Sequence, residues 1–268
     1  MTTLLDPSTE LPLPASDDSI FGPDVDIARL VHYWDAQARQ RPMTAEQMVG
    51  ADVRAQRLGI PGEQLMEHAG TAVAAVARAL MLSADRPLDS LVLILCVPGN
   101  NGGDGFVAAR RLAEAGIRSE VVLVASETTP TTRDAALNWE RLAGLELVER
   151  VHGPRSHDVA IFLNGIERAG IVMDALLGTG VRGPLREPIR TAVDVAVRAR
   201  ELLVPILAVD TPTSLDLSNG VPSDPNVHAD ATITFHRPKQ GLGTRAGKAL
   251  AGQVLVAPIG IPALADLG

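Results

Sequence analysis

The chain has 268 residues, 46% of them hydrophobic, and is long enough to bury a sizeable core. Its formal net charge of -8 disfavours nucleic acid as a partner, because binding to a phosphate backbone relies on clustered Lys and Arg. No apolar run approaches the roughly 18 residues of a membrane span, and the N-terminus has no basic segment followed by an apolar one. We therefore expect no membrane contact and a cytoplasmic location.

Residues 1–40 are predicted to form an acidic N-terminal extension, because they carry a net charge of -5. The prolines and acidic residues up to Asp26 suggest a loosely held segment outside the core. Residues 27–40 could form a short helix that carries Trp34. A single domain is expected over residues 41–268, and its only cysteine, Cys96, lies in an apolar run that predicts a buried core residue.

Two helices are expected at the start of this domain. Thr44 and Gln47 have the spacing of a capping box at the head of a helix that reaches about residue 58, where Gly59 and Pro61 end it. Apolar residues then recur at helical spacing over residues 63–81, and the many alanines there permit close packing.

Strands and helices alternate along the rest of the chain. The pattern predicts strands at 91–97, 120–125, 146–151, 171–176, 204–209, 231–235 and 253–257, and helices at 105–115, 132–142 and from 188. Continuous Val, Ile and Leu runs indicate strands with both faces covered. The expected fold is an α/β three-layer αβα Rossmann-like sandwich with a mostly parallel central sheet, in which ligands bind at the carboxyl ends of the strands.

A glycine-rich segment, residues 98–105, follows the strand at 91–97. Four glycines in seven residues admit positive φ and allow a ligand to approach the backbone, while the start of a helix presents free N–H groups to an anion. The segment predicts a phosphate-binding turn, in which a branched side chain at Gly103 would impair binding more than folding. A tight turn with Asp104 as an ordinary N-cap is the alternative.

Two familiar nucleotide motifs fit this segment poorly. Gly103, Gly105 and Ala108 match the dinucleotide fingerprint in spacing, with Glu127 at the distance of a ribose contact. The glycines would fall within the helix start, and three threonines and a proline after Glu127 indicate a surface position. No Gly-Lys-Ser/Thr sequence is present, so a Walker loop is excluded.

Two carboxylates stand at later strand ends. Asp174 nearly ends an apolar strand, where a lone carboxylate is costly unless it is paired or bound to a cation; an Asp that caps the following loop is the alternative. Asp210 follows the strand at 204–209, and Pro212 forces the chain out of the strand at once. A turn-forming role is the simpler interpretation of Asp210.

The chain resembles the YjeF N-terminal domain family, whose catalytic members are NAD(P)H-hydrate epimerases. The resemblance spans about residues 44–262 and rests on six segments in order, at 65–70, 99–110, 174–180, 209–216, 232–242 and 259–262. The Asn-Asn-Gly-Gly-Asp sequence at 100–104 is the most specific single motif among them.

The resemblance implies roles for particular residues. It makes Asp210 the catalytic acid/base and implies one potassium ion per subunit, held by Asn101, Asp174 and Thr213, whose oxygens suit a hard cation. The substrate would be bound by Asp210 together with two loops, Asn100, Asn101, Gly102, Gly103 and Asp104 in the first, and Gly178, Thr179, Gly180, Val181, Arg182, Gly183 and Pro184 in the second. Arg182 could neutralise a pyrophosphate or could simply be a solvated loop residue.

The chain departs from the family pattern in a few places. Thr213 and Ser214 stand where the family usually has Ser-Gly, so the hydroxyl is retained while a glycine that can adopt positive φ is lost. His68 replaces an asparagine, and His236 stands where small residues are common.

Three functions are therefore compared. The first is an epimerase that interconverts the R and S epimers of hydrated NADH or NADPH (NADHX and NADPHX), as a repair of nicotinamide nucleotides. The second is a non-catalytic nucleotide-binding or scaffold domain of the same fold, and the third an ordinary NAD-dependent dehydrogenase. For the epimerase we expect a homodimer and a separate NAD(P)HX dehydratase in the same pathway.

Overall fold

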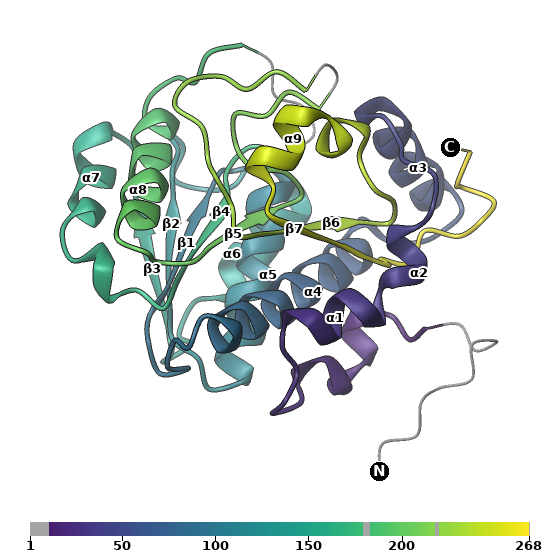
Figure 1. The fold of residues 1–268 in the computed structure, drawn as a ribbon, viewed down its shortest axis with the longest axis horizontal. Helices are drawn as coiled ribbons and strands as arrows, with labels where there is room; N and C mark the ends of the chain where they lie inside the picture. The colour runs from purple at the N-terminus through teal and green to yellow at the C-terminus, as the bar shows by residue number, and fades with distance from the viewer. Residues whose placement is uncertain (1–10, 179–182, 218–219, 268) are drawn as a thin grey trace.

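The computed structural model describes residues 11–178, 183–217 and 220–267, and its centre is one seven-stranded sheet (Figure 1). The strand order is β3–β2–β1–β4–β5–β6–β7, and every neighbouring pair is parallel. The strands are β1 (Val92–Cys96), β2 (Ser119–Leu123), β3 (Val148–His152), β4 (Ile171–Ala175), β5 (Ile206–Val209), β6 (Ala231–Phe235) and β7 (Gln253–Ala257). The order runs outward in both directions from β1 and β4, so the carboxyl ends of these two strands mark the switch point where ligands are expected.

Helices cover both faces of the sheet. In the described part of the chain they are α1 (Ile27–Tyr33), α2 (Asp35–Ala38), α3 (Ala45–Arg57), α4 (Gly62–Ser83), α5 (Asn100–Glu114), α6 (Arg133–Arg141), α7 (Ser156–Ala160), α8 (Ile189–Glu201) and α9 (Arg245–Leu250). Helices α7 and α8 lie on one face, and α4, α5 and α6 lie on the other (Figure 1). The predicted three-layer fold is confirmed.

The side chains of each strand alternate between two hydrophobic cores. Ile94 and Cys96 of β1 belong to the larger core with α4 and α5, whereas Leu93 and Leu95 belong to the core with α8. Because both faces are buried, the strands read as continuous apolar runs, and this is why their positions could be predicted from the sequence. The short helices α7 and α9 were not predicted.

The N-terminal segment that follows residue 10 packs on the domain, so its predicted place outside the core was wrong. Ile20, Leu30 and Trp34 are buried in the larger core. Polar groups also anchor the segment, since Tyr33 Oη donates a hydrogen bond to Asp17 at 2.6 Å. Its helical part is divided into α1 and α2, with Trp34 at the junction between them.

Helix α4 crosses the centre of the larger core. By length and composition alone it is apolar enough to span a membrane, contrary to the expectation that no run comes close. In the fold, 89% of its most apolar window is buried within the protein, as expected for a core helix. Its capped neighbour α3 begins at the predicted capping box, in which Thr44 and Gln47 exchange hydrogen bonds.

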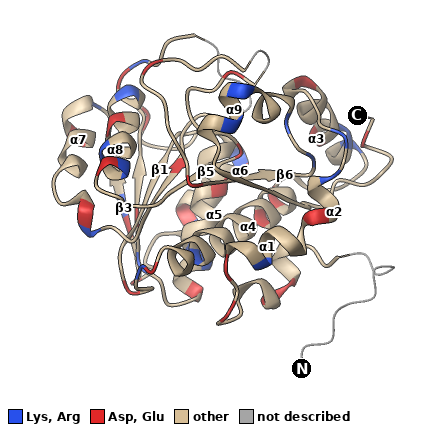
Figure 2. Cartoon of the chain, in the orientation of Figure 1, with Lys and Arg blue, Asp and Glu red and all other residues tan. Residues whose placement is uncertain are grey.

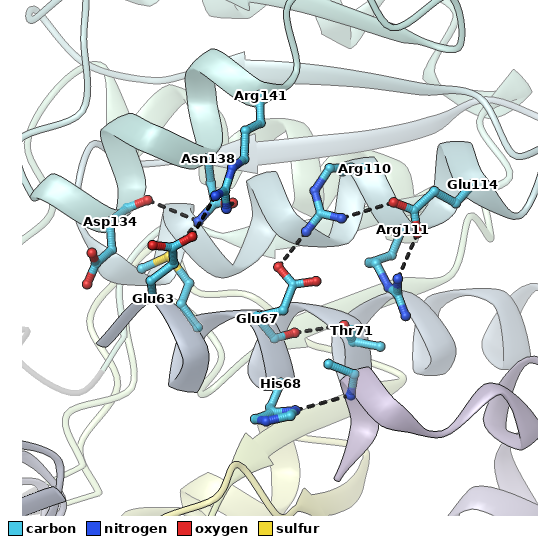
Figure 3. A network of polar contacts seen from close by, with 12 residues as sticks. Glu63, Glu67, His68, Thr71, Arg110, Arg111, Glu114, Asp134, Asn138 and Arg141 are labelled. Carbon is cyan, nitrogen blue, oxygen red and sulfur yellow. Dashed lines mark hydrogen bonds and ion pairs between the residues drawn. The ribbon is translucent and has the colours of Figure 1, made fainter. Parts of the chain in front are cut away.

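Ion pairs join α4 to α5 and α6 on the outer surface of this layer (Figure 3). Arg110 of α5 pairs with Glu67 of α4 and, at 2.9 Å, with Glu114 of its own helix. Arg141 of α6 pairs with Glu63 of α4 at 2.6 Å. On the opposite layer, acidic and basic residues are interspersed along α8 (Figure 2).

Candidate active site

A cavity of about 530 Å³ lies at the carboxyl edge of the sheet. Residues that follow β1, β4 and β5 form part of its wall. The start of α5, one side of α3 and the first turns of α4 also contribute to it. Its polar lining comprises Asp52, Gln56, Asn100, Asn101, Asp104, Asp134, Asp210 and Lys239. This is the edge at which ligands bind in parallel α/β sheets.

The glycine-rich segment is helical rather than an open turn. Helix α5 begins at Asn100, so the predicted start at residue 105 was five residues late. Gly99 is the N-cap, and Gly103 N–H already donates to Gly99 O at 3.0 Å. The first N–H groups of a helix have no partner within it, so those of the first turn remain available to an anion.

The buried glycines of this segment allow close packing rather than positive φ, which corrects the prediction. A Cβ at Gly102 would lie 1.9 Å from Val97 O, and one at Gly103 would lie 2.6 Å from Met66 Cε. Neither residue is part of the cavity wall, whereas Gly99, Asn100, Asn101 and Asp104 are. The helix therefore presents its N-terminal backbone and the side chains of Asn100, Asn101 and Asp104 to the cavity.

Asp174 and Thr213 are joined by a short hydrogen-bond pair. Asp174 is completely buried and accepts hydrogen bonds from Thr213 Oγ1 at 2.6 Å and from Thr213 N at 2.7 Å. Burial raises the pKa of Asp174 to about 6, and the bonds from Thr213 oppose this rise. Asp174 has no basic partner among the described residues, so none of them supplies a counterion for its charge.

The side chain of Asn101, on α5, lies close to the Asp174–Thr213 pair. Thr213 Oγ1 accepts a hydrogen bond from Leu177 N at 2.9 Å, and a Cβ at the adjacent Gly178 would lie 3.3 Å from Asn101 Oδ1. The buried Asn101 Nδ2 atom has no hydrogen-bond partner within the part of the chain that the structure describes. If the Asn101 amide is rotated by half a turn, its oxygen takes the position of Nδ2. An oxygen at that position suits a cation, whereas an unpaired N–H group does not.

Asp210 is held by a hydroxyl and an ammonium group at the end of β5. Thr234 Oγ1 donates to Asp210 Oδ1 at 2.8 Å, and Lys239 Nζ lies 3.5 Å from the same oxygen. Lys239 is completely buried, which lowers its pKa, while the neighbouring Asp210 opposes this shift. Asp210 itself adopts a φ of 65°, in the left-handed region.

A second carboxylate, Asp104, shares the cavity with Asp210. Burial raises the pKa of Asp104 well above its usual value, and the negative charges of Asp210 and Asp52 raise it further. Asp52 of α3 is itself desolvated, which raises its pKa, and Gln56 donates to it at 3.3 Å. The cavity thus combines several carboxylates with a single lysine among the described residues.

Part of the second predicted loop lies outside the described residues, namely Thr179, Gly180, Val181 and Arg182. Gly178 is part of the cavity wall, whereas Gly183 and Pro184 are not among the residues that form it. Glu127, the ribose contact of the dinucleotide fingerprint, is exposed and is not part of the wall either.

The residues that depart from the family pattern do not fill the cavity. Ser214 adopts a φ of 86°, and its hydroxyl donates to Pro225 O at 2.7 Å. His68 accepts a hydrogen bond from Ala15 N through Nδ1 at 3.2 Å (Figure 3), so it fastens the N-terminal segment. None of these residues is part of the cavity wall.

Lys239 and Asp52 are cavity residues that the sequence did not reveal. Lys239 lies within a segment that resembles the family, but a lysine after a strand is normally exposed, and no spacing rule brings it to Asp210. Asp52 is on the helix at 45–57, which carries no motif. One feature of the sequence could have indicated Lys239: it lies four residues after the end of β6, the strand that neighbours β5.

Fold and site together define an α/β protein in which a helix start and several acidic groups line a cavity at the carboxyl edge of a parallel sheet. Residues 62–241 match the family model described as YjeF-related protein N-terminus, and the chain belongs to this family.

Named relatives agree with this assignment. The chain is 39% identical over 225 residues to the bifunctional NAD(P)H-hydrate repair enzyme Nnr of Methanothermobacter thermautotrophicus, matching 82% of this chain and 40% of that protein. It is 34% identical over 226 residues to the NAD(P)H-hydrate epimerase of Cenarchaeum symbiosum, matching 84% of this chain and 98% of that protein. The first of these relatives is thus much longer than the matched region.

A solved structure supports the same fold. The crystal structure of yeast ynu0, YNL200c, superposes with a TM-score of 0.66 at 26% identity and covers 76% of this chain and 84% of that chain.

Proposed function

We propose that the chain is an epimerase that interconverts the R and S epimers of hydrated NADH or NADPH and so repairs nicotinamide nucleotides. One observation carries this proposal: the cavity brings the start of α5 together with the Asp210 carboxylate. A helix start suits a pyrophosphate, and a carboxylate suits proton exchange at a reacting carbon. The Cenarchaeum symbiosum relative, which the chain matches over 98% of its length, is named NAD(P)H-hydrate epimerase.

The substrate phosphates would contact the first turn of α5. Asn100, Asn101 and Gly102 contribute the free backbone N–H groups there, and Asp104 stands one turn further along. Gly103 is not part of the cavity wall and packs against Met66 of α4. We assign the rest of the substrate contacts to the loop from Gly178 to Pro184 and to Asp210.

Asn101, Asp174 and Thr213 would hold a potassium ion. The buried Asp174 carboxylate without a basic partner and the unpartnered Asn101 amide fit such a cation. When bound, the ion supplies positive charge close to the substrate phosphates. The residues themselves keep the carboxylate in place through the two hydrogen bonds from Thr213.

Asp210 is the proposed acid/base of the reaction. The hydrated ring carbon carries a hydroxyl group and is bonded to the ring nitrogen, so reversible loss of this hydroxyl erases the stereochemistry. A carboxylate can exchange the proton that this step requires and can balance the positive charge that develops on the ring. No oxidant is required, in contrast to an NAD-dependent dehydrogenase.

The wider setting is part of the same proposal. We propose a homodimer located in the cytoplasm, with NAD(P)HX dehydratase as a separate protein of the pathway. The Methanothermobacter thermautotrophicus relative is named a bifunctional repair enzyme, which supports a second activity in the same pathway. Light scattering on the purified chain tests the dimer, since a monomeric mass would contradict it.

The decisive test of function uses a single purified NADHX epimer. We expect the chain to produce the other epimer faster than the spontaneous reaction, as followed by chromatography. A bound nucleotide without epimerisation would favour a non-catalytic binding domain instead. A steady change of nicotinamide absorbance with alcohols would favour a dehydrogenase.

A further inference from the structure

The two carboxylates of the cavity, Asp104 and Asp210, have opposite surroundings. Asp210 Oδ1 accepts a hydrogen bond from Thr234 Oγ1 at 2.8 Å, with Lys239 Nζ at 3.5 Å from the same atom. Asp104 has neither a hydrogen bond to its carboxyl group nor an ion pair within the described ranges, and it faces carboxylates. One group is thus surrounded by donors and the other by like charge.

Three oxygen atoms surround the amino group of the Lys239 side chain. Lys239 Nζ lies 2.8 Å from Phe235 O, 3.2 Å from Arg237 O and 2.9 Å from Thr234 Oγ1. Carbonyl oxygens only accept, and the Thr234 hydroxyl uses its proton on Asp210, so it too accepts from the lysine. Three oxygen acceptors around the nitrogen suit an ammonium group, and this group lies beside the Asp210 carboxylate.

Asp104 faces negative charge from several elements. Asp210 after β5 and Asp52 of α3 are the charges that act on it, and Asp134 is part of the same cavity wall. The Cys96 thiol of β1 is also near enough to feel its charge. The start of α5 would favour the ionised form, but this effect fades within the first turn and Asp104 is the fifth residue of the helix. Like-charge repulsion and desolvation both raise the pKa of Asp104, which favours its protonated form.

We propose that Asp104 is the proton-donating acid of the reaction and that Asp210, which is paired with Lys239 and hydrogen-bonded to Thr234, is the proton-accepting base. Two carboxyl groups whose surroundings separate their charge states are the usual arrangement of an acid and a base in one site. Lys239 is a positioning residue, because it acts through Asp210. This assignment rests on the proposed function and divides the role given there to Asp210 alone.

The first half of the reaction removes the hydroxyl group from the hydrated ring carbon. Asp104 transfers its proton to the hydroxyl oxygen, and the carbon–oxygen bond breaks with both electrons going to oxygen, which releases water. The lone pair of the ring nitrogen forms a carbon–nitrogen double bond, and the positive charge is balanced by Asp210.

Water then adds to the opposite face of the same carbon in the second half of the reaction. Its oxygen forms the new bond, the electron pair of the double bond returns to nitrogen, and Asp210 takes the released proton. Proton exchange through water in the cavity restores both carboxyl groups. No atom is oxidised or reduced.

Difference infrared spectroscopy at neutral pH tests the charge assignment without any activity, because the carbonyl band of a protonated carboxyl group is distinct from carboxylate bands. The spectrum of wild type minus Asp104→Asn should contain a protonated carboxyl band, and wild type minus Asp210→Asn should contain carboxylate bands. Glu114→Gln, at the outer end of the same helix, is the matched control and should show carboxylate bands only. Exchanged or identical signatures for Asp104 and Asp210 would overturn the proposal.

The rate profile tests the roles. Asp104→Asn should lower kcat by about 100-fold or more and remove the alkaline limb of the kcat/KM profile, since the acid is gone. Lys239→Met should move the acidic limb to higher pH, because it removes the positive charge that lies 3.5 Å from the proposed base. Thr234→Val should move the acidic limb in the same direction. This variant replaces Lys239→Met in the test if the lysine variant fails to fold. If the variants fold and the limbs of their kcat/KM profiles do not move, the assignment of acid and base is contradicted. If the wild type is inactive but gives the expected infrared bands, only the proposed function is refuted.

Discussion

Three non-glycine residues adopt left-handed backbone conformations close to the cavity. Asp210, Ser214 and His236 have φ values of 65°, 86° and 64°. Each such residue costs on the order of 1–2 kcal/mol and persists only where its surroundings fix it. Asp210 N donates to Ile233 O at 2.8 Å, and His236 N donates to Ala257 O at 2.8 Å. The ends of β5 and β6 are thereby tied to their neighbours.

Asp210→Asn should abolish epimerisation while the protein remains folded and binds nucleotide. The amide preserves size and can still accept from Thr234, but it cannot take up and return a proton. Lys239 keeps its two carbonyl acceptors, so the loss of the ion pair should lower the melting temperature without unfolding the chain.

The measurement for this variant is the interconversion rate of purified NADHX epimers, with the spontaneous rate subtracted. The melting temperature and the ligand Kd are recorded on the same samples. Such groups contribute about 100-fold or more, so a variant with over about a tenth of the wild-type rate would argue for a structural Asp210.

At the scale of elements, helix α5 depends on glycines that allow contact with its neighbours. We expect Gly103→Val to destabilise the fold by about 1–3 kcal/mol, because overpacking forces its neighbours apart. The added side chain meets Met66 Cε at 2.6 Å and Ala135 Cβ at 3.1 Å. This revises the prediction from sequence, in which Gly103 affected binding more than folding. Chemical denaturation of the two proteins is the measurement.

Gly99→Ala is the matched comparison for Gly103→Val. A Cβ at Gly99 would meet nothing within 4 Å, and its φ of -91° suits any residue. Gly99 is part of the cavity wall, so this variant should keep its stability and lose nucleotide affinity. Equal stability of Gly103→Val and wild type would show that the helix can move away from α4 at little cost.

The N-terminal helices can be monitored through the only tyrosine of the chain. Desolvation and the bond to Asp17 raise the pKa of Tyr33 to about 12. Because the folded pKa is raised, the stabilisation by the neutral phenol is present below pH 10 and is lost as the pH rises through about 12.

We expect an ultraviolet titration of wild type to give a phenol midpoint near pH 12. Asp17→Asn should lower this midpoint, because it removes the charge that opposes ionisation of the phenol. Asp18→Asn, an exposed neighbour, is the control and should leave it unchanged. A midpoint near the ordinary value of about 10 in wild type would mean that this segment does not stay packed in solution.

For the molecule as a whole, potassium should stabilise the fold if it occupies the proposed site. A ligand present at 100 times its Kd adds about 2.7 kcal/mol to the free energy of unfolding. We therefore expect a higher melting temperature in potassium than in choline at equal ionic strength, and no such difference for Asp174→Asn. Glu201→Gln, which removes an exposed carboxylate, should respond to potassium like wild type. Identical melting of wild type in both salts would contradict the site.

Much of the fold could be predicted from sequence, because the strands are buried on both faces. Strands β6 and β7 agree with prediction to the residue, at Ala231–Phe235 and Gln253–Ala257. The N-terminal segment could not be placed, since its acids and prolines conceal the few apolar residues, such as Trp34, that reach the core. Composition averages over a segment, whereas docking depends on individual side chains.

The site was predictable where it depends on local sequence. Asp174 and Thr213 were expected together and are hydrogen-bonded, and Asp210 stands at its expected strand end. The helical form of residues 100–105 was missed, because glycine lowers helix propensity and only contact with Val97 and Met66 explains its use there. Lys239 was missed for a similar reason, since its burial arises from tertiary packing.

The pairing of Met43 with the Lys239 segment has a consequence for how the protein folds. Met43 N donates to Pro238 O at 2.8 Å, and Gln240 N donates to Met43 O at 2.9 Å, so the backbone on both sides of Lys239 is fastened to a segment from near the other end of the chain. Contacts so distant in sequence form late, because the intervening chain must first be ordered. The sheet can therefore assemble before the buried lysine is fixed beside Asp210. Catalytic competence would then be acquired in the final stage of folding, after most of the secondary structure is in place.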